Sequence, residues 1–137
     1  MRHTVWRLSK IGKSVPIERF EQLEVWQAAH QLVLNIYRYT QRLPNEEKFG
    51  LILQMRRTAV SVPANIAEGF KRRGLADKSR FYNIAQASLE ELRYYVVLCR
   101  DLGYPNGEEG IPERAESVSK MLYGLVRSLE TRPPQTG

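Results

Sequence analysis

The chain is poor in the residues that build disulfide-bonded and metal-stabilised folds. Its 137 residues include one cysteine, Cys99, and two histidines, His3 and His30. A single cysteine excludes an intramolecular disulfide framework, and no Cys/His cluster has the spacing of zinc ligands. Cys99 falls on the apolar face of a predicted helix, where a free cysteine behaves as a small apolar residue. We therefore expect neither a metal site nor a reactive thiol.

Long apolar runs are also missing. The longest are only a few residues, so no segment can span a bilayer. Residues 1–17 are basic but lack the apolar stretch of a secretory signal. The length suits one domain that buries a core without disulfides or metal. The expected setting is the reducing cytoplasm, with no membrane partner.

No catalytic group of residues is evident. Neither histidine has a recognisable carboxylate and nucleophile as partners. Glu90 and Glu91 are adjacent, so on a helix they point in two directions, and they lack the Glu-x-x-His pairing of di-metal bundles. The sequence therefore predicts a protein that is not an enzyme and needs no cofactor.

What the chain does have is positive charge in two places. The net charge is +6. Residues 1–17 carry Arg2, Arg7, Lys10 and Lys13 with no acid, and residues 71–80 carry five bases against Asp77. Elsewhere acids balance or outnumber bases. Such concentration favours a polyanionic partner, although a charge cluster can also be a solvated surface.

Four helical patterns cover most of the chain and predict an all-α fold. The first runs over 23–42 and is stopped by the Leu43-Pro44-Asn45 sequence, and the second runs from about Asn45 to about Phe70. The third begins with Asp77 as N-cap and follows the stripe Phe81, Ala85, Ser88, Leu92, Tyr95, Cys99 and Leu102, which Ile84, Leu89 and Val96 widen. The fourth starts at Pro112 and runs to about Leu129.

No segment shows convincing period-two alternation, so strands are not expected. The predicted architecture is an antiparallel up-down-up-down four-helix bundle over 18–131. A flexible basic segment, 1–17, precedes it and a disordered tail, 132–137, follows.

The second helix contains a proline in its apolar stripe. Pro63 removes one backbone hydrogen bond and pushes against the carbonyl of Ala59, at a cost of about 3 kcal/mol in an ordinary helix interior. We expect the helix to be interrupted or kinked there. A second, polar row runs beside the apolar stripe; its members are Thr58, Ser61, Asn65 and Glu68. It is either a solvent-facing row or a polar seam that fixes a kink or a subunit contact.

The basic residues around this helix form the candidate nucleic-acid surface. Phosphate contacts need long cationic side chains with little base-specific geometry. The residues concerned are Arg56, Arg57, Lys71, Arg72, Arg73, Lys78 and Arg80. Tyr82 and Phe70 are close in sequence and could stack on unpaired bases. Core packing is the alternative for such aromatics, and we favour it for Phe70 and Phe81.

Three stretches of sequence together resemble the four-helix-bundle family of 23S rRNA intervening-sequence proteins, over residues 18–130. They are FEQLEVWQAAHQLVLNIY, QMRRTAVSVPANIAEGFKRR and RFYNIAQASLEELRYYVVLCRDLGY. The family is similar to the accessory variability proteins of diversity-generating retroelements. Its most specific pieces here are Arg56-Arg57, the run Ser61-x-Pro63-x-Asn65-Ile66-Ala67-Glu68-Gly69, the first-helix Leu23-Glu24-Val25-Trp26, and Asp101-Leu102-Gly103-Tyr104.

The resemblance implies a small bundle that assembles into a basic homopentameric ring. In the retroelement branch it implies binding to a reverse transcriptase and to RNA, or an RNA/DNA hybrid, in support of mutagenic cDNA synthesis. The alternative is a protein–protein scaffold of the intervening-sequence branch with no direct nucleic-acid role. The residues leave both open.

Overall fold

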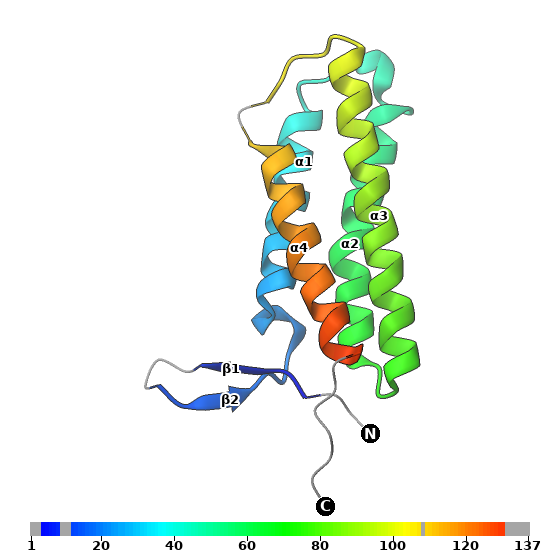
Figure 1. Ribbon diagram of the computed structural model, residues 1–137. Helices are drawn as coiled ribbons and strands as arrows, with labels where there is room; N and C mark the ends of the chain where they lie inside the picture. Colours follow the sequence, from blue (N-terminus) through cyan, green and yellow to red (C-terminus); the bar gives the residue numbers. More distant parts are fainter. Residues whose placement is uncertain (1–3, 9–11, 108, 131–137) are drawn as a thin grey trace, which may run out of the picture.

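The computed structural model describes residues 4–8, 12–107 and 109–130. Most of them belong to four helices: α1 (Glu24–Thr40), α2 (Leu51–Lys71), α3 (Leu75–Asp101) and α4 (Ile111–Glu130). Each helix packs against the next, and α4 returns to pack against α1 (Figure 1). Successive helices run in opposite directions. The predicted all-α four-helix bundle is confirmed.

The core lies between the four helices and is built from their apolar faces. The predicted faces of α1, α2 and α4 are buried almost as expected, since residues three and four apart share one side of a helix. The buried members from these helices include Ala29, Leu32, Ile36, Met55, Ala59, Val62, Ile66, Ala115, Val118 and Leu122. This continuous apolar interior is what holds the helices side by side.

The buried face of α3 is rotated from the prediction. The structure buries Lys78, Tyr82, Ala85, Leu89, Leu92 and Cys99. Ala85, Leu89, Leu92 and Cys99 were predicted, but Phe81 is only partly buried and Leu102 is 52% exposed. The prediction chose Phe81 over its neighbour Tyr82 as the first core aromatic. In the structure Tyr82 is the buried aromatic, because its ring packs against Gly69 of α2.

Two predicted helix starts are wrong by a few residues. Asn45–Glu47 forms a separate 3-10 turn, η2, and α2 begins only after Gly50. The side chain of Glu47 nevertheless accepts a hydrogen bond from the backbone of Leu51, at 3.4 Å, so it caps the helix from outside. The N-cap of α3 is Gly74, not Asp77. Asp77 lies in the first turn, where a carboxylate suits the positive end of the helix dipole.

The chain passes through Pro63 without leaving the helix. α2 is continuous from Leu51 to Lys71, and Pro63 is buried within it. The helix is therefore not interrupted. The ring of Pro63 adds to the apolar interior, and packing of this face outweighs the loss of one backbone bond.

The described part of the basic N-terminal segment forms a small hairpin, which the sequence did not predict. Strand β1 (Trp6–Leu8) pairs antiparallel with β2 (Ser14–Pro16), with Arg7 opposite Val15. A further bond joins the backbone N–H of Ile17 to the carbonyl of Val5, at 2.6 Å. Three residues per strand are too few for a period-two pattern to be visible. A short 3-10 turn, η1 (Phe20–Gln22), then leads into α1.

Some predictions concern residues outside the described ranges. The tail 132–137, with Arg2 and Lys10, is among them. Within the described residues, none of the helices has the length and hydropathy needed to cross a bilayer. The same residues contain no group of three histidine, cysteine or acidic side chains placed to hold a metal ion.

Candidate nucleic-acid interface

The strongest concentration of exposed positive charge is at the turn between α2 and α3. α2 ends at Lys71, and Arg72, in extended backbone, and Arg73 follow before α3 begins at Leu75. We call Lys71, Arg72, Arg73 and Arg80 the corner patch; all four are exposed. Basic side chains are favoured where α2 ends, because the last carbonyls of a helix carry partial negative charge.

Phe81 organises two members of the corner patch. The guanidinium carbons of Arg72 and Arg80 each lie 4.7 Å from the centre of the Phe81 ring. Arg72 also pairs with Glu68, one helical turn earlier, at 3.0 Å. Stacking on a ring limits the motion of a guanidinium while leaving its N–H donors at the edge, where an anion can reach them. The patch is therefore partly ordered before any ligand arrives.

Lys78 does not belong to this surface, contrary to the prediction. It is 2% exposed, and its ammonium donates to the carbonyls of Gly69, at 3.1 Å, and Phe70, at 2.7 Å. The first turn of α3 thus supplies a cation to the last turn of α2, where backbone carbonyls lack helical partners. Lys78 positions the turn that carries the corner patch, but a phosphate cannot reach it.

Arg56 and Arg57 lie away from the corner patch as well. At a rise of about 1.5 Å per residue, Arg57 and Lys71 are about 20 Å apart along α2. Arg56 is held against the end of α1: its Nε donates to Oγ1 of Thr40 at 2.8 Å, and its guanidinium lies over the ring of Tyr37 at 4.6 Å. Arg57 is exposed. The predicted single phosphate surface is therefore at least two separate regions.

The predicted base-stacking role of Tyr82 is wrong, because the ring is inside the bundle. Tyr82 is 1% exposed, and burial raises the pKa of its phenol. Phe70 is 5% exposed, so its expected core role is confirmed. Phe81, expected in the core, is the aromatic that meets the charged surface. The signal available in the sequence was its place directly after Arg80, at the end of the basic stretch 71–80.

Gly69 explains why Tyr82 is the buried one of the two aromatics. A Cβ built on Gly69 would stand 2.5 Å from Cε1 of Tyr82, much closer than two carbon atoms can approach. The missing side chain lets the ring of Tyr82 lie directly against the backbone of α2. This contact sets the distance between α2 and α3 just before the corner patch.

The polar row on α2 faces α3 of the same subunit. Oγ of Ser61 is 2.9 Å from Oγ of Ser88, and Oγ1 of Thr58 donates to Glu91 at 2.8 Å. Asn65 donates to both the carbonyl and the hydroxyl of Ser61, at 2.7 and 3.0 Å. Thr58 and Ser61 thus form a seam between two helices of one chain, while Glu68 is exposed and pairs with Arg72. A contact of this row with another subunit stays a prediction. Pro63 has no N–H, so the carbonyl of Ala59 loses its helical hydrogen bond. The side chain of Asn65 bonds to the carbonyl of Ser61 and does not replace that bond.

The Asp101-Leu102-Gly103-Tyr104 motif ends α3. Gly103 has a φ of +80°, and its N–H bonds to the carbonyl of Arg100, while the N–H of Tyr104 bonds to that of Cys99. These are the two bonds of a Schellman cap, which requires glycine at the left-handed position. The hydroxyl of Tyr104 then donates to Glu47 at 2.6 Å and ties the end of α3 to η2.

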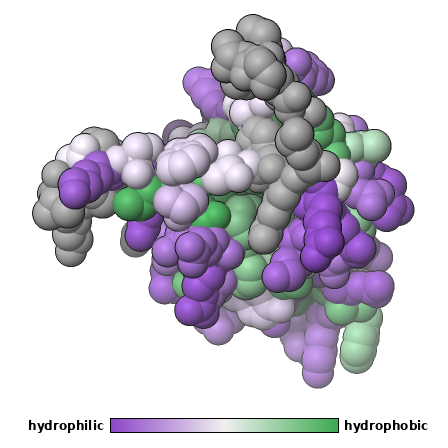
Figure 2. All heavy atoms as spheres, turned by 90° about the horizontal axis from the view of Figure 1, so that it is seen from below, coloured by the Kyte–Doolittle hydropathy of each residue, from purple (hydrophilic) through white to green (hydrophobic). Residues whose placement is uncertain are grey.

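The hairpin brings further basic residues to the end of the bundle that carries the corner patch (Figure 1). Arg7 and Lys13 belong to it, and both are exposed. Figure 2 looks onto this end and shows hydrophilic side chains gathered around it. Trp6, on β1, is 59% exposed among them. A polyanion that lies across this end would meet basic groups from the hairpin and from the corner patch.

Most of these features lie in the part of the chain that matches a known protein family. The model of the 23S rRNA-intervening sequence protein family matches residues 21–124, which include the polar seam, Gly69 and the corner patch but not the hairpin. Comparison with the curated proteins gives no match. Because the family model covers about three quarters of the sequence, the chain belongs to the 23S rRNA-intervening sequence protein family.

Proposed function

We propose that this protein is a non-enzymatic RNA-binding bundle that works as a homo-oligomer, a pentamer, and assists a reverse transcriptase of a diversity-generating retroelement. RNA, or an RNA/DNA hybrid, binds at the end of the bundle that carries the corner patch. The observation that supports this most is the pair of guanidiniums, Arg72 and Arg80, stacked on Phe81 beside exposed Lys71 and Arg73.

The chemistry of the patch favours the phosphate backbone over bases. Guanidinium groups meet phosphate oxygens with two parallel N–H donors, and the contact does not depend on base identity. The buried position of Tyr82 removes one base-stacking platform from this surface. Binding is therefore expected to be strong at low salt and to show little sequence preference.

Oligomerisation would increase the number of corner patches that contact one RNA molecule. Several copies of one patch around a symmetric ring engage a long polyanion together, so the combined affinity exceeds that of one subunit by orders of magnitude. The outer side of α2 offers apolar surface for such assembly: Leu53 and Val60, seven residues apart, are 40% and 42% exposed. Both lie on the same side of the helix as Arg57.

The same apolar side chains favour a second candidate function, a protein–protein scaffold in which the positive charge has no nucleic-acid role. Phe49, just before α2, is 83% exposed and extends this surface. A scaffold would capture its partner through these residues, and changes in the corner patch would leave that capture intact.

A charge-reversal experiment separates the two functions. The test variant carries Lys71→Glu, Arg72→Glu and Arg73→Glu. The control variant carries Lys48→Glu, Arg114→Glu and Lys120→Glu, three exposed sites outside the corner patch with the same change in net charge. Binding to a fluorescent RNA is measured by anisotropy at fixed salt, and oligomer mass by native mass spectrometry.

We expect the test variant to lose about 100-fold in RNA affinity at 0.1 M salt, from three lost phosphate contacts, with its oligomer mass unchanged. The control variant should lose far less. Equal losses in both variants would show that only bulk charge matters. Capture of the reverse transcriptase by a protein that binds no RNA would support the scaffold, and a monomeric wild-type mass would contradict the ring.

A further inference from the structure

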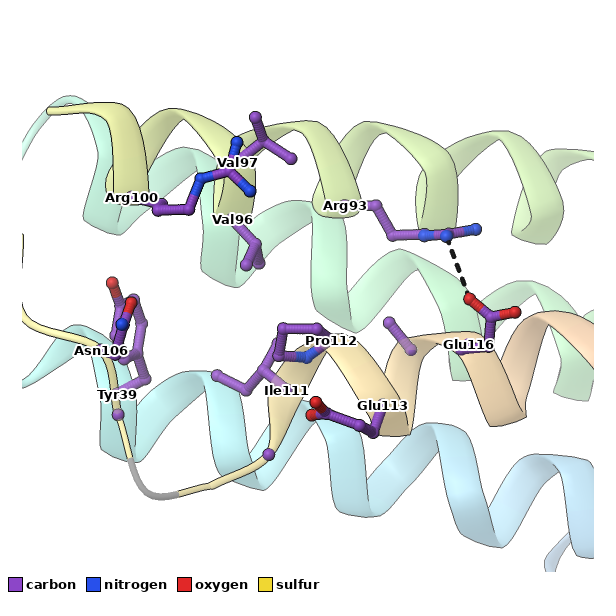
Figure 3. Close-up of a pocket in the computed structure, with 13 residues that line it drawn as sticks. Tyr39, Arg93, Val96, Val97, Arg100, Asn106, Ile111, Pro112, Glu113 and Glu116 are labelled. Atoms are coloured by element: carbon purple, nitrogen blue, oxygen red, sulfur yellow. Dashed lines mark hydrogen bonds and ion pairs between the residues drawn. The ribbon is translucent and has the colours of Figure 1, made fainter.

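A groove of about 640 Å³ lies at the other end of the bundle from the corner patch (Figure 3). It runs between the last turns of α3 and the first turn of α4, and the loop before α4 closes one end. From Lys78 to Arg100 the axis of α3 extends about 30 Å at a rise of about 1.5 Å per residue. The groove is therefore a separate site from the proposed RNA surface.

The middle of the groove is apolar. Val96 and Val97 line it from α3, and Ile111, Pro112 and Ala115 line it from α4. Val97 is 40% exposed, so this surface faces solvent in the isolated chain. The volume falls within the range of roughly 300–1,000 Å³ that is usual for small-molecule sites. An apolar body of several carbon atoms would fit against it.

Polar groups converge at the end of the groove that the loop closes. Asn106 and Gly107 come from the loop, and Tyr39 comes from α1. Burial raises the pKa of Tyr39 to about 12, which keeps its phenol neutral near pH 7. Arg100, on the last turn of α3, extends along the rim beside Val97 (Figure 3). This end offers hydrogen-bond donors, the guanidinium of Arg100 and, beside Gly107, the ion pair of Arg42 with Glu109.

The other guanidiniums around the groove are held by carboxylates: Arg42 is paired with Glu109 beside Gly107, and Arg93 has two acidic partners. Arg93 is paired with Glu90 at 2.9 Å and with Glu116 at 3.4 Å, and Glu116 is also 3.8 Å from Lys120, so these two bases and two acids cancel. Glu113 also lines the groove and is exposed, at the first turn of α4. Among the described residues, Arg100 bonds only through Nε to exposed Asp101. Its terminal nitrogens are available to an anion.

We propose that this groove binds a small organic monoanion that has an apolar body and a carboxylate head. The body lies on Val96, Val97 and Ile111, and the carboxylate accepts hydrogen bonds from Arg100, with the amide of Asn106 beside it. A guanidinium matches a carboxylate with two parallel bonds, and a neighbouring apolar floor strengthens that contact by excluding water.

The test uses three probes with one body and different heads: octanoate, octanol and octylamine. The full-length protein, labelled at valine and isoleucine methyls, is titrated with each probe and followed by methyl NMR. Three variants are compared, Arg100→Gln, Val97→Glu and the control Arg127→Gln, which changes an exposed arginine of α4 outside the groove. Circular dichroism confirms that each variant folds.

Octanoate is expected to shift the methyls of Val96, Val97 and Ile111 and to bind at least 10-fold more tightly than octanol. Arg100→Gln should weaken octanoate at least 10-fold, and Val97→Glu should abolish its binding without changing RNA affinity. Tighter binding of octylamine, methyl shifts spread over the surface, or equal loss in Arg127→Gln would overturn the proposal. A fall in oligomer mass on Val97→Glu would do so too, since a second copy would then occupy the groove.

Discussion

Replacing Gly69 by alanine should destabilise the protein, although glycine inside a helix is normally the weaker choice. The new Cβ would stand 2.5 Å from Cε1 and 2.8 Å from Cδ1 of Tyr82, and 3.2 Å from Cβ of Phe81. Tyr82 is 1% exposed and has no room to retreat. The two helices must therefore separate, or the ring must leave its position.

The expected magnitude follows from two opposing effects. Overpacking a close-packed interior costs about 1–3 kcal/mol. Alanine in place of a helical glycine recovers roughly 0.5–1 kcal/mol. The net loss in free energy of unfolding is about 1–2 kcal/mol, which corresponds to a fall in melting temperature of roughly 3–8 °C for a domain of this size.

Gly124 provides the matched control. It lies inside α4, and a Cβ built on it meets nothing within 4 Å. Gly124→Ala should therefore stabilise the protein by about 0.5–1 kcal/mol. Thermal and urea unfolding of both variants and wild type, at one protein concentration, measures the difference. If Gly69→Ala is as stable as Gly124→Ala, the close contact of Tyr82 with α2 does not exist.

Three further predictions concern single side chains. Lys78→Met should lower the free energy of unfolding by roughly 1–3 kcal/mol, measured by urea titration, because two carbonyls at the end of α2 lose a buried partner. The hydrogen bond to Glu47 raises the pKa of Tyr104 to about 12. Folding therefore favours the protonated phenol, so its contribution to stability is present below about pH 10, the usual pKa of tyrosine, and is lost as the pH rises toward 12. Tyr104→Phe should remove that part of the alkaline dependence in unfolding curves recorded from pH 8 to 12. Cys99 is fully buried and burial raises the pKa of its thiol, so Ellman's reagent should label it only on unfolding.

The helical periodicity predicted most of the fold, because amphipathic faces repeat over many residues. This pattern alone predicts the buried faces around Ile36, Met55 and Leu122, and all three side chains are buried. The helix starts were less predictable. Asn45 and Asp77 are good capping residues, but tertiary packing placed the starts of α2 and α3 at Leu51 and Leu75.

The candidate site was predictable in its charge but not in its geometry. Counting bases identified Lys71–Arg73, yet the count treated Lys78 as one more surface cation. Only the packing of α3 on α2 brings its ammonium to the carbonyls of Gly69 and Phe70. The choice between Phe81 and Tyr82 depended on the same contact. Periodicity alone could not decide which of the two rings is buried. Adjacent residues on a helix lie about 100° apart, so Phe81 and Tyr82 both border the buried face.

The central claim is that the corner patch binds the phosphate backbone of RNA, and the salt dependence of binding tests it most directly. The logarithm of the association constant is plotted against the logarithm of salt concentration, for wild type and for the Lys71→Glu, Arg72→Glu, Arg73→Glu variant. Each subunit that contacts single-stranded RNA through four phosphates contributes about −3 to the slope, and loss of three should bring its contribution to about −1. A wild-type slope near zero, or the same slope in both proteins, would contradict the claim.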